Sequence, residues 1–344
     1  MKTLFSIITL AILVSCTNNK TSQHQNTNAN DNINFTIAFG SCNHQNAPNN
    51  LWNDILKNKP NLWIWGGDII YADTENMKLM QSYYNQVKND SNYVNFKNNV
   101  DILGTWDDHD FGINDGGTEY IQKDSAQQLL LDFLDVPTND VRRNQKGIYH
   151  SQLFKIGKKS IKIILLDTRY FRTALTEDPS GKKRYIPNTD NNGTMLGTMQ
   201  WNWLESELKN SNSDFNIIMS SIQFLSHEHG WESWGNMPYE VEKLQQIIVD
   251  SKAKGVLILS GDRHLSEISV KNLEGLKYPL YDFTSSGLTH SYEAYTFEPN
   301  EYRTSSVISV KSFGVLNIDL QSNSVTMELR GLHNTLLDSI SQKY

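Results

Sequence analysis

WIWGGDIIYADT, residues 63–74, begins as an apolar strand, breaks at two glycines and continues into Asp68 and Tyr71. Glycine lets a backbone approach a ligand closely, so a carboxylate directly after such a strand is expected where the following loop meets a ligand. A carboxylate there can bridge two cations, and Tyr71, three residues on, can point at the same ion. Taken alone this pattern is weak, because Asp and Tyr are also common in turns. Its meaning depends on the residues at the ends of the other strands.

Five further apolar runs end in polar side chains that are capable of chemistry, and amphipathic helical patterns lie between several of them. The predicted strands cover residues 35–44, 101–110, 161–172, 215–224 and 256–264, and the predicted helices cover 49–58, 75–90, 119–135, 198–211 and 239–254, the fourth capped by Thr198. Residues 312–331 alternate as a C-terminal hairpin. This order predicts a single mixed α/β domain in which the loops after the strands form one shared site.

Residues 107–110, Asp-Asp-His-Asp, form the densest acidic cluster. Adjacent carboxylates repel one another unless cations or hydrogen bonds absorb the charge, so a solvated loop and a metal site are the two interpretations. The cluster follows a strand and Trp106, which favours a metal site.

Two other strand ends carry a pair of side chains two residues apart, Cys42 with His44 and Asp262 with His264. In extended backbone such residues face the same way, so both can reach one ion or ion pair. The alternative for the second pair is an ordinary turn with Asp as its cap. The repetition of the spacing at Cys42 makes a bystander cysteine the weaker interpretation.

Together these motifs resemble those of the calcineurin-like metallophosphoesterases and, more closely, the PhoD-like (alkaline phosphatase D) family. The segments that carry the resemblance are C-N-H (42–44), G-D-I-I-Y (67–71), W-D-D-H-D (106–110) and G-D-R-H (261–264), with L-D-T-R-Y-F-R (166–172), residues 200–208, 220–223, 231–238 and 285–291. The resemblance runs from about residue 35 to 330. It implies a four-layer α/β/β/α sandwich with two mixed sheets.

The resemblance also implies a metal-dependent phosphoric ester hydrolase in which a hydroxide activated by two metal ions attacks phosphorus. Cys42, Tyr71 and His264 would bind Fe3+, with Asp68 bridging to a divalent cation. That second ion, held by Asp108 and Asp262, would be calcium, with zinc or manganese as alternatives. His109 matches the catalytic histidine that contacts phosphate.

Some positions stay open. His44 is a ligand, a supporting residue or neither, and Gln223 stands about where the wider superfamily has a histidine. Arg169 either contacts phosphate as a catalytic residue or pairs with Asp167. Trp201, Trp203, Trp231 and Trp234 are expected in the core or in a pocket wall. Residues 177–197 form a long turn-rich insertion that is expected to overhang the site.

The N-terminus predicts export. Residues 1–16 resemble a bacterial lipoprotein signal peptide with lipobox Cys16, residues 17–33 form a polar tether, and residues 34–344 form the catalytic domain. A lipidated Cys16 would anchor the protein to a bacterial membrane, facing the periplasm or the cell surface. A plain secretory signal is the alternative.

The net charge of −7 gives no indication of a basic surface for binding nucleic acid. No protein partner is predicted, and the expected partners are a phosphate-ester substrate and the membrane. Two other functions compete with the phosphatase interpretation: a phospholipase D-like phosphodiesterase, and a non-catalytic, membrane-tethered binding lipoprotein.

Overall fold

The computed structural model describes residues 33–344 of the chain. The predicted signal peptide and all but the last residue of the predicted tether lie outside these residues, and the first strand begins at Asn34. Within the described part, no helix has the length and apolar character needed to cross a membrane.

One six-stranded sheet contains the strand that precedes Asp68. Its order is β14 (Leu336–Lys343), β13 (Ser324–Gly331), β12 (Ser312–Asp319), β1 (Asn34–Gly40), β2 (Leu62–Gly66) and β3 (Asp101–Thr105). β1, β2 and β3 are parallel, whereas β12, β13 and β14 pair antiparallel. The C-terminal hairpin is therefore confirmed as β12 and β13, and it extends the sheet next to β1.

The second six-stranded sheet has the order β10 (Ser266–Lys271), β11 (Leu280–Ser285), β9 (Val256–Ser260), β8 (Phe215–Met219), β5 (Lys159–Leu165) and β4 (His150–Ile156). Its four central strands are parallel, and β10 and β4 are antiparallel edges. A two-stranded hairpin, β6 (Thr176–Glu177) and β7 (Tyr185–Ile186), lies in the insertion.

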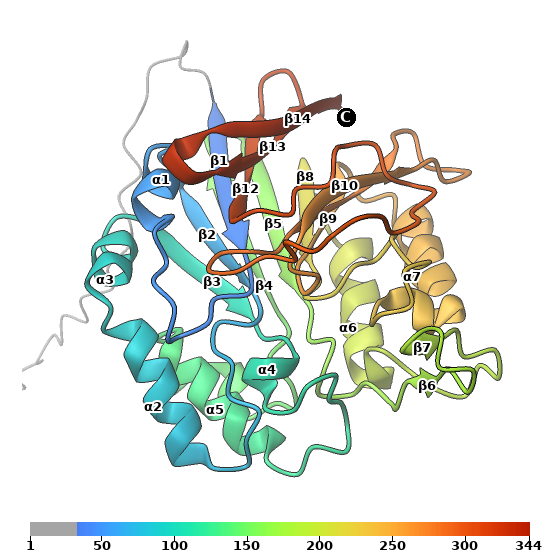
Figure 1. Cartoon of the computed structure of the whole chain (residues 1–344). Coiled ribbons are helices and arrows are strands. Elements are labelled where there is room, and N and C mark those ends of the chain that lie inside the picture. Colours follow the sequence, from blue (N-terminus) through green and yellow to red (C-terminus); the bar gives the residue numbers. More distant parts are fainter. Residues whose placement is uncertain (1–32) are drawn as a thin grey trace, which may run out of the picture. The chain divides into compact units, whose positions relative to one another are not determined.

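Helices cover the outer face of each sheet. They are α1 (Trp52–Leu56), α2 (Met77–Lys88), α3 (Ser91–Lys97), α4 (Asp108–Phe111), α5 (Lys123–Phe133), α6 (Gly197–Lys209) and α7 (Pro238–Ser251), with 3-10 turns at Val141–Arg143, Trp234–Asn236 and Leu332–Asn334. Figure 1 shows α2, α3 and α5 on one side and α6 and α7 on the other.

β2 explains the layering. Its alternate residues Leu62 and Ile64 belong to the apolar cluster between the two sheets, while Trp63 and Trp65 pack with residues of α1, α2 and α3. A strand buried on both faces reads as one continuous apolar run. A third cluster joins the second sheet to α6 and α7. The predicted α/β/β/α sandwich with two mixed sheets is confirmed (Figure 1).

The five predicted helices are confirmed within a few residues, but the predicted cap at Thr198 is wrong. α6 begins at Gly197, so Thr198 is already helical, and the side chain of the N-cap residue Leu196 does not cap the helix. The hydroxyl of Thr194 instead accepts a hydrogen bond from the Gly197 N–H at 2.9 Å. A threonine three residues before the first helical residue thus fulfils the role that the pattern assigned to Thr198.

Candidate metal centre

The candidate metal ligands come from the segments that directly follow parallel strands of both sheets, and Asp108 is the first residue of α4. Cys42 lies just beyond β1, Asp68 beyond β2, Asp108 beyond β3, and Asp262 and His264 beyond β9. The sheets face each other, so these strand ends meet at one edge of the sandwich. Gly67 is needed for this meeting: its φ is +96°, and a Cβ there would lie 2.4 Å from Cβ of Asp107.

One group joins a thiol, a carboxylate, an imidazole and a phenol. Ligand atoms of Cys42, Asp68 and His264 lie within 4.8 Å of one another. Cys42 Sγ is 3.3 Å from Asp68 Oδ2, and the Tyr71 hydroxyl lies 3.3 Å from the same oxygen and 3.0 Å from His264 Nε2. Four donors from three distant parts of the chain are therefore adjacent.

A second group shares Asp68 and is made mainly of carboxylates. Asp68, Asp108 and His109 offer ligand atoms within 4.8 Å of one another, and so do Asp107, Asp108 and Asp262. Hard divalent cations prefer carboxylate oxygens, whereas a thiolate suits a softer transition metal. The two groups thus differ in donor chemistry and meet at Asp68.

Buried oxygens without partners show that these residues fit cations. Asp68 Oδ1 and Asp108 Oδ1 are shielded from solvent and accept no hydrogen bond. An unpaired buried carboxylate oxygen is costly, and coordination to a cation is one way to satisfy it.

The backbone is also unusual at this place. Cys42, Asp68, Asp262 and His264 all have φ between +50° and +71°. Left-handed conformations are disfavoured for residues other than glycine and persist where the surrounding structure imposes them. Four of the thirteen non-glycine residues with positive φ in the described part of the chain are thus candidate ligands.

In the absence of a cation, several candidate ligands have raised pKa values, which disfavour their ionised forms. Burial raises the pKa of the Cys42 thiol to about 11, and burial and neighbouring carboxylates raise the pKa of Asp262 well above its ordinary value. Burial also raises the pKa of Asp68, with the Cys42 thiolate contributing further. Asp108 differs: burial opposes ionisation, but Arg169 and His109 outweigh it and lower its pKa to about 2.

His109 lies beside these carboxylates and contacts Asp73. The His109 Nδ1 atom is 2.7 Å from Asp73 Oδ2. Burial lowers the pKa of the imidazole, but Asp68 and Asp73 outweigh this and raise it to about 10. In the metal-free protein, the protonated form of His109 is therefore favoured at neutral pH, and in that form the imidazole can donate a proton.

Comparison with known proteins assigns the family. A family model described as PhoD-like phosphatase matches residues 37–329 of the chain. The chain belongs to the PhoD-like phosphatase family.

The similarity of this PhoD-like chain to individual proteins is distant. It is 23% identical to alkaline phosphatase D of Bacillus subtilis over 270 residues, which are 67% of this chain and 46% of that protein. The chain thus spans about half the length of this curated relative.

Two solved structures share the fold. The structure of PhoD matches with a TM-score of 0.70 at 18% identity, over 90% of this chain and 68% of the other. A dimetal phosphatase from Danio rerio matches with a TM-score of 0.55 at 11% identity, over 91% of this chain and all of the other.

The side chain of Arg169 has neither of the two environments expected from the sequence of this PhoD-like chain. Its side chain is fully buried and pairs with Asp107 and with Glu232, whose Oε2 lies 2.6 Å from Nη1. Only its backbone N–H contacts Asp167. Arg169 does not line the pocket, but it holds Asp107 and also Glu232, which does line it.

The structure also defines the surroundings of His44 and Gln223, whose roles the sequence left open. His44 stacks on Tyr71 with ring centroids 5.2 Å apart, so it supports the phenol from the outside. Gln223 donates from Nε2 to Glu267 at 2.9 Å and to Thr284 at 3.0 Å. Its amide nitrogen is thus bonded to residues of β10 and β11.

Sequence reasoning missed four residues around the PhoD-like centre. Asp115 and Glu232 form a further acidic group with Asp108, Asp73 contacts His109, and the His290 ring lies 4.5 Å from that of His264. Asp73 lies at the end of segment 63–74, and Glu232 and His290 lie in the segments 231–238 and 285–291 that carry the family resemblance, but no role was predicted for any of the four.

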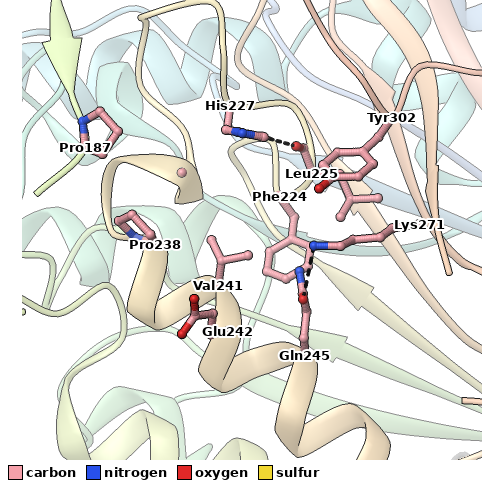
Figure 2. Close-up of a pocket in the computed structure, with 11 residues that line it drawn as sticks. Pro187, Phe224, Leu225, His227, Pro238, Val241, Glu242, Gln245, Lys271 and Tyr302 are labelled. Carbon is pink, nitrogen blue, oxygen red and sulfur yellow. Dashed lines mark hydrogen bonds between the residues drawn. The ribbon is translucent and has the colours of Figure 1, made fainter. Parts of the chain in front are cut away.

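Two pockets of similar size flank the loop after β8. One, of about 310 Å³, has Asp108, His109, Asp262 and His264 in its lining. The other, of about 350 Å³, is lined mainly by apolar side chains with Lys271 and His227 (Figure 2), and none of the predicted metal ligands lines it. The first pocket is therefore the candidate active site.

Proposed function

We propose that this chain hydrolyses phosphate esters, as a phosphomonoesterase or phosphodiesterase, with a pair of metal ions at the candidate metal centre. The observation that carries the proposal is the meeting of two different donor groups at Asp68, beside His109 and next to a pocket that Asp108, His109, Asp262 and His264 line. Family membership supports it.

The donor chemistry supports an assignment of the ions. Cys42, Tyr71 and His264 would hold Fe3+, because thiolate and phenolate both stabilise an oxidised, Lewis-acidic ion. Asp108 and Asp262 would hold a divalent cation, calcium in our proposal, and Asp68 would contact both ions. When bound, the two cations would supply the positive charge that polarises the phosphoryl oxygens.

The chain's own residues would handle the leaving group. Water attacks phosphorus, the bond from phosphorus to the ester oxygen breaks, and His109 gives its proton to the departing alcohol oxygen. The proton that the attacking water loses passes to solvent, and His109 regains a proton from solvent before the next turnover. Asp73 would fix the imidazole through Nδ1, which leaves Nε2 to donate. The deep burial of Arg169 and Glu232 would keep Asp107 and Asp108 in place.

We further propose that the protein is exported and lipid-anchored through Cys16. The supporting observation is in the sequence alone: an apolar run ends in L-V-S-C at residues 13–16, followed by a polar segment.

The test is hydrolysis by metal-loaded protein of p-nitrophenyl phosphate, bis-p-nitrophenyl phosphate and phosphatidylcholine. We expect turnover of at least one p-nitrophenyl ester, lost by about 100-fold or more in His109→Asn and in Asp68→Asn. His333→Asn, a histidine on a C-terminal turn remote from the pocket, is the matched control and should retain activity. Preference for phosphatidylcholine would favour the phospholipase interpretation. Protein that takes up no metal and hydrolyses none of the three would favour the binding lipoprotein.

A further inference from the structure

The wall of the candidate active-site pocket differs in chemistry from its floor. The floor carries three of the candidate metal ligands, Asp108, Asp262 and His264, whereas the wall contains Trp231, Tyr292, Arg184 and Arg263. Trp231 is 42% exposed and Tyr292 is 37% exposed. A large exposed aromatic side chain beside a catalytic floor is a surface on which a ligand can pack.

Trp231 is held in one orientation. Its Nε1 donates to Glu298 at 3.2 Å, and the Arg263 guanidinium lies 5.5 Å from the centre of its ring. Arg263 itself makes two hydrogen bonds to Glu298, at 2.8 and 2.9 Å. A fixed aromatic ring binds a flat partner at little cost in side-chain entropy.

The insertion also holds the Trp231 loop. The carbonyl of Gly230 accepts hydrogen bonds from the backbone N–H groups of Arg184 and Tyr185 at 3.1 and 2.9 Å. The Tyr185 hydroxyl in turn donates to Asp115 at 2.7 Å, and the Asp115 N–H donates to Asp108 at 2.7 Å. Trp231 and the floor of the pocket are thus joined through a continuous set of hydrogen bonds.

The charges of the wall are already balanced. Arg184 pairs with Asp115 at 2.5 Å, and Arg263 pairs with Glu298 at 2.8 Å. The wall therefore offers no strong unpaired cation for a second anionic group on the substrate. It fits an uncharged portion that packs against the rings.

We infer that the alcohol portion of the substrate carries a flat aromatic group, an aryl ring or a nucleobase, which stacks on Trp231 while the phosphate lies over the metal ligands. This inference rests on the proposed function and adds the class of substrate to it. It sets flat aromatic esters apart from polyol and alkyl esters, which gain less from stacking.

The test compares the binding of two non-hydrolysable ligands to the metal-loaded protein by calorimetry, benzylphosphonate and cyclohexylmethylphosphonate. They are similar in size and charge but differ in the flatness of the ring. We expect the benzyl compound to bind about fivefold more tightly. Trp231→Ala should abolish this preference, and Trp231→Phe should keep most of it. A nucleoside 5′-phosphonate is the third ligand. If it binds more tightly than the benzyl compound, the flat group is assigned to a nucleobase. If it binds more weakly, the flat group is assigned to an aryl ring.

Tyr302→Ala is the matched control. Tyr302 is also an aromatic pocket residue with a cation over its ring, Lys271 at 5.0 Å, but it lies in the pocket of Figure 2. The control should keep the preference. Equal binding of the benzyl and cyclohexylmethyl compounds would overturn the inference, and so would a preference for the benzyl compound that survives in Trp231→Ala. If p-nitrophenyl esters are still hydrolysed, the proposed function stands in either case. Protein that neither binds these ligands nor hydrolyses any ester would overturn the proposed function itself.

Discussion

Asp73 Oδ2 lies 2.7 Å from His109 Nδ1. An aspartate in the segment after β2 therefore holds a histidine in the segment after β3. β2 and β3 are adjacent and parallel, and the loops after them therefore meet. The contact fixes the ring through one nitrogen and leaves the other toward the pocket. It also stabilises the protonated form of the ring.

Asp73→Asn should lower the pKa of His109, because the amide removes a negative charge from beside the imidazole. A general acid must be protonated, so activity falls as pH rises through its pKa. The alkaline limb of the pH profile of kcat should thus move to lower pH in the variant, with kcat reduced about tenfold or more at the optimum. An unchanged alkaline limb would show that Asp73 does not act through His109.

Cys42→Ser and Tyr71→Phe test the proposed iron site. Thiolate or phenolate bound to ferric iron gives a visible charge-transfer band, so iron-loaded protein should be coloured. Each variant should shift or lose the band and should bind less iron by metal analysis. Asp262→Asn, at the proposed divalent site, is the control and should keep the colour. Active protein that is colourless and free of iron would refute the assignment of this ion.

Much of the fold could be predicted from sequence, because the buried strands are short apolar runs with polar ends. β4, β10, β11 and β14 were not predicted. As sheet edges, β4 and β14 hold only exposed and partly buried residues, and β10 and β11 mix polar with apolar side chains. At the site, the strand-end motifs located Cys42, Asp68 and His264. Arg169 was misread because its partners Asp107 and Glu232 lie 62 and 63 positions away in the chain. Local spacing does not report such long-range pairing.

Metal binding should release protons. Burial raises the pKa of Cys42 to about 11 and raises the pKa of Tyr71 well above its ordinary value, so both are protonated in metal-free protein at neutral pH. A thiolate or phenolate ligand must lose its proton, and iron affinity should therefore rise with pH, by about tenfold per pH unit for each proton released. Calorimetry in buffers of different ionisation enthalpy counts these protons. Cys42→Ser should release fewer, and affinity that does not vary with pH would contradict the assignment.

Arg169→Met should mainly affect stability. Arg169 is fully buried between Asp107 and Glu232, and its loss leaves the buried Asp107 carboxylate without a counter-charge, whereas Glu232 keeps Arg172. Removal of one partner from a buried ion pair costs about 3–5 kcal/mol. Urea unfolding should show this loss, whereas Lys209→Met, which breaks an exposed pair with Glu205, should show no measurable change. A variant of normal stability with a raised KM would instead indicate direct contact between Arg169 and phosphate.

His150 should make the fold sensitive to acid at a place remote from the metal centre. It begins the edge strand β4, and burial lowers its pKa to about 4, with Arg142 adding to the effect while Asp140 and Glu207 oppose it. The folded pKa lies below the ordinary value of about 6.5. The stability that neutral His150 contributes is therefore complete above about pH 6.5 and is lost as the pH falls toward about 4.

Between about pH 7 and about pH 4.5 this loss should amount to about 1–2 kcal/mol, after allowance for solvent around the partly buried ring. His150→Gln cannot gain a proton, so its free energy of unfolding should fall by that much less over the same interval. Urea unfolding at the two pH values measures the difference, and His333→Gln controls for the loss of a histidine at the surface. If wild type and His150→Gln lose stability in parallel, His150 is not protonated on unfolding in this range, and the acid sensitivity arises elsewhere.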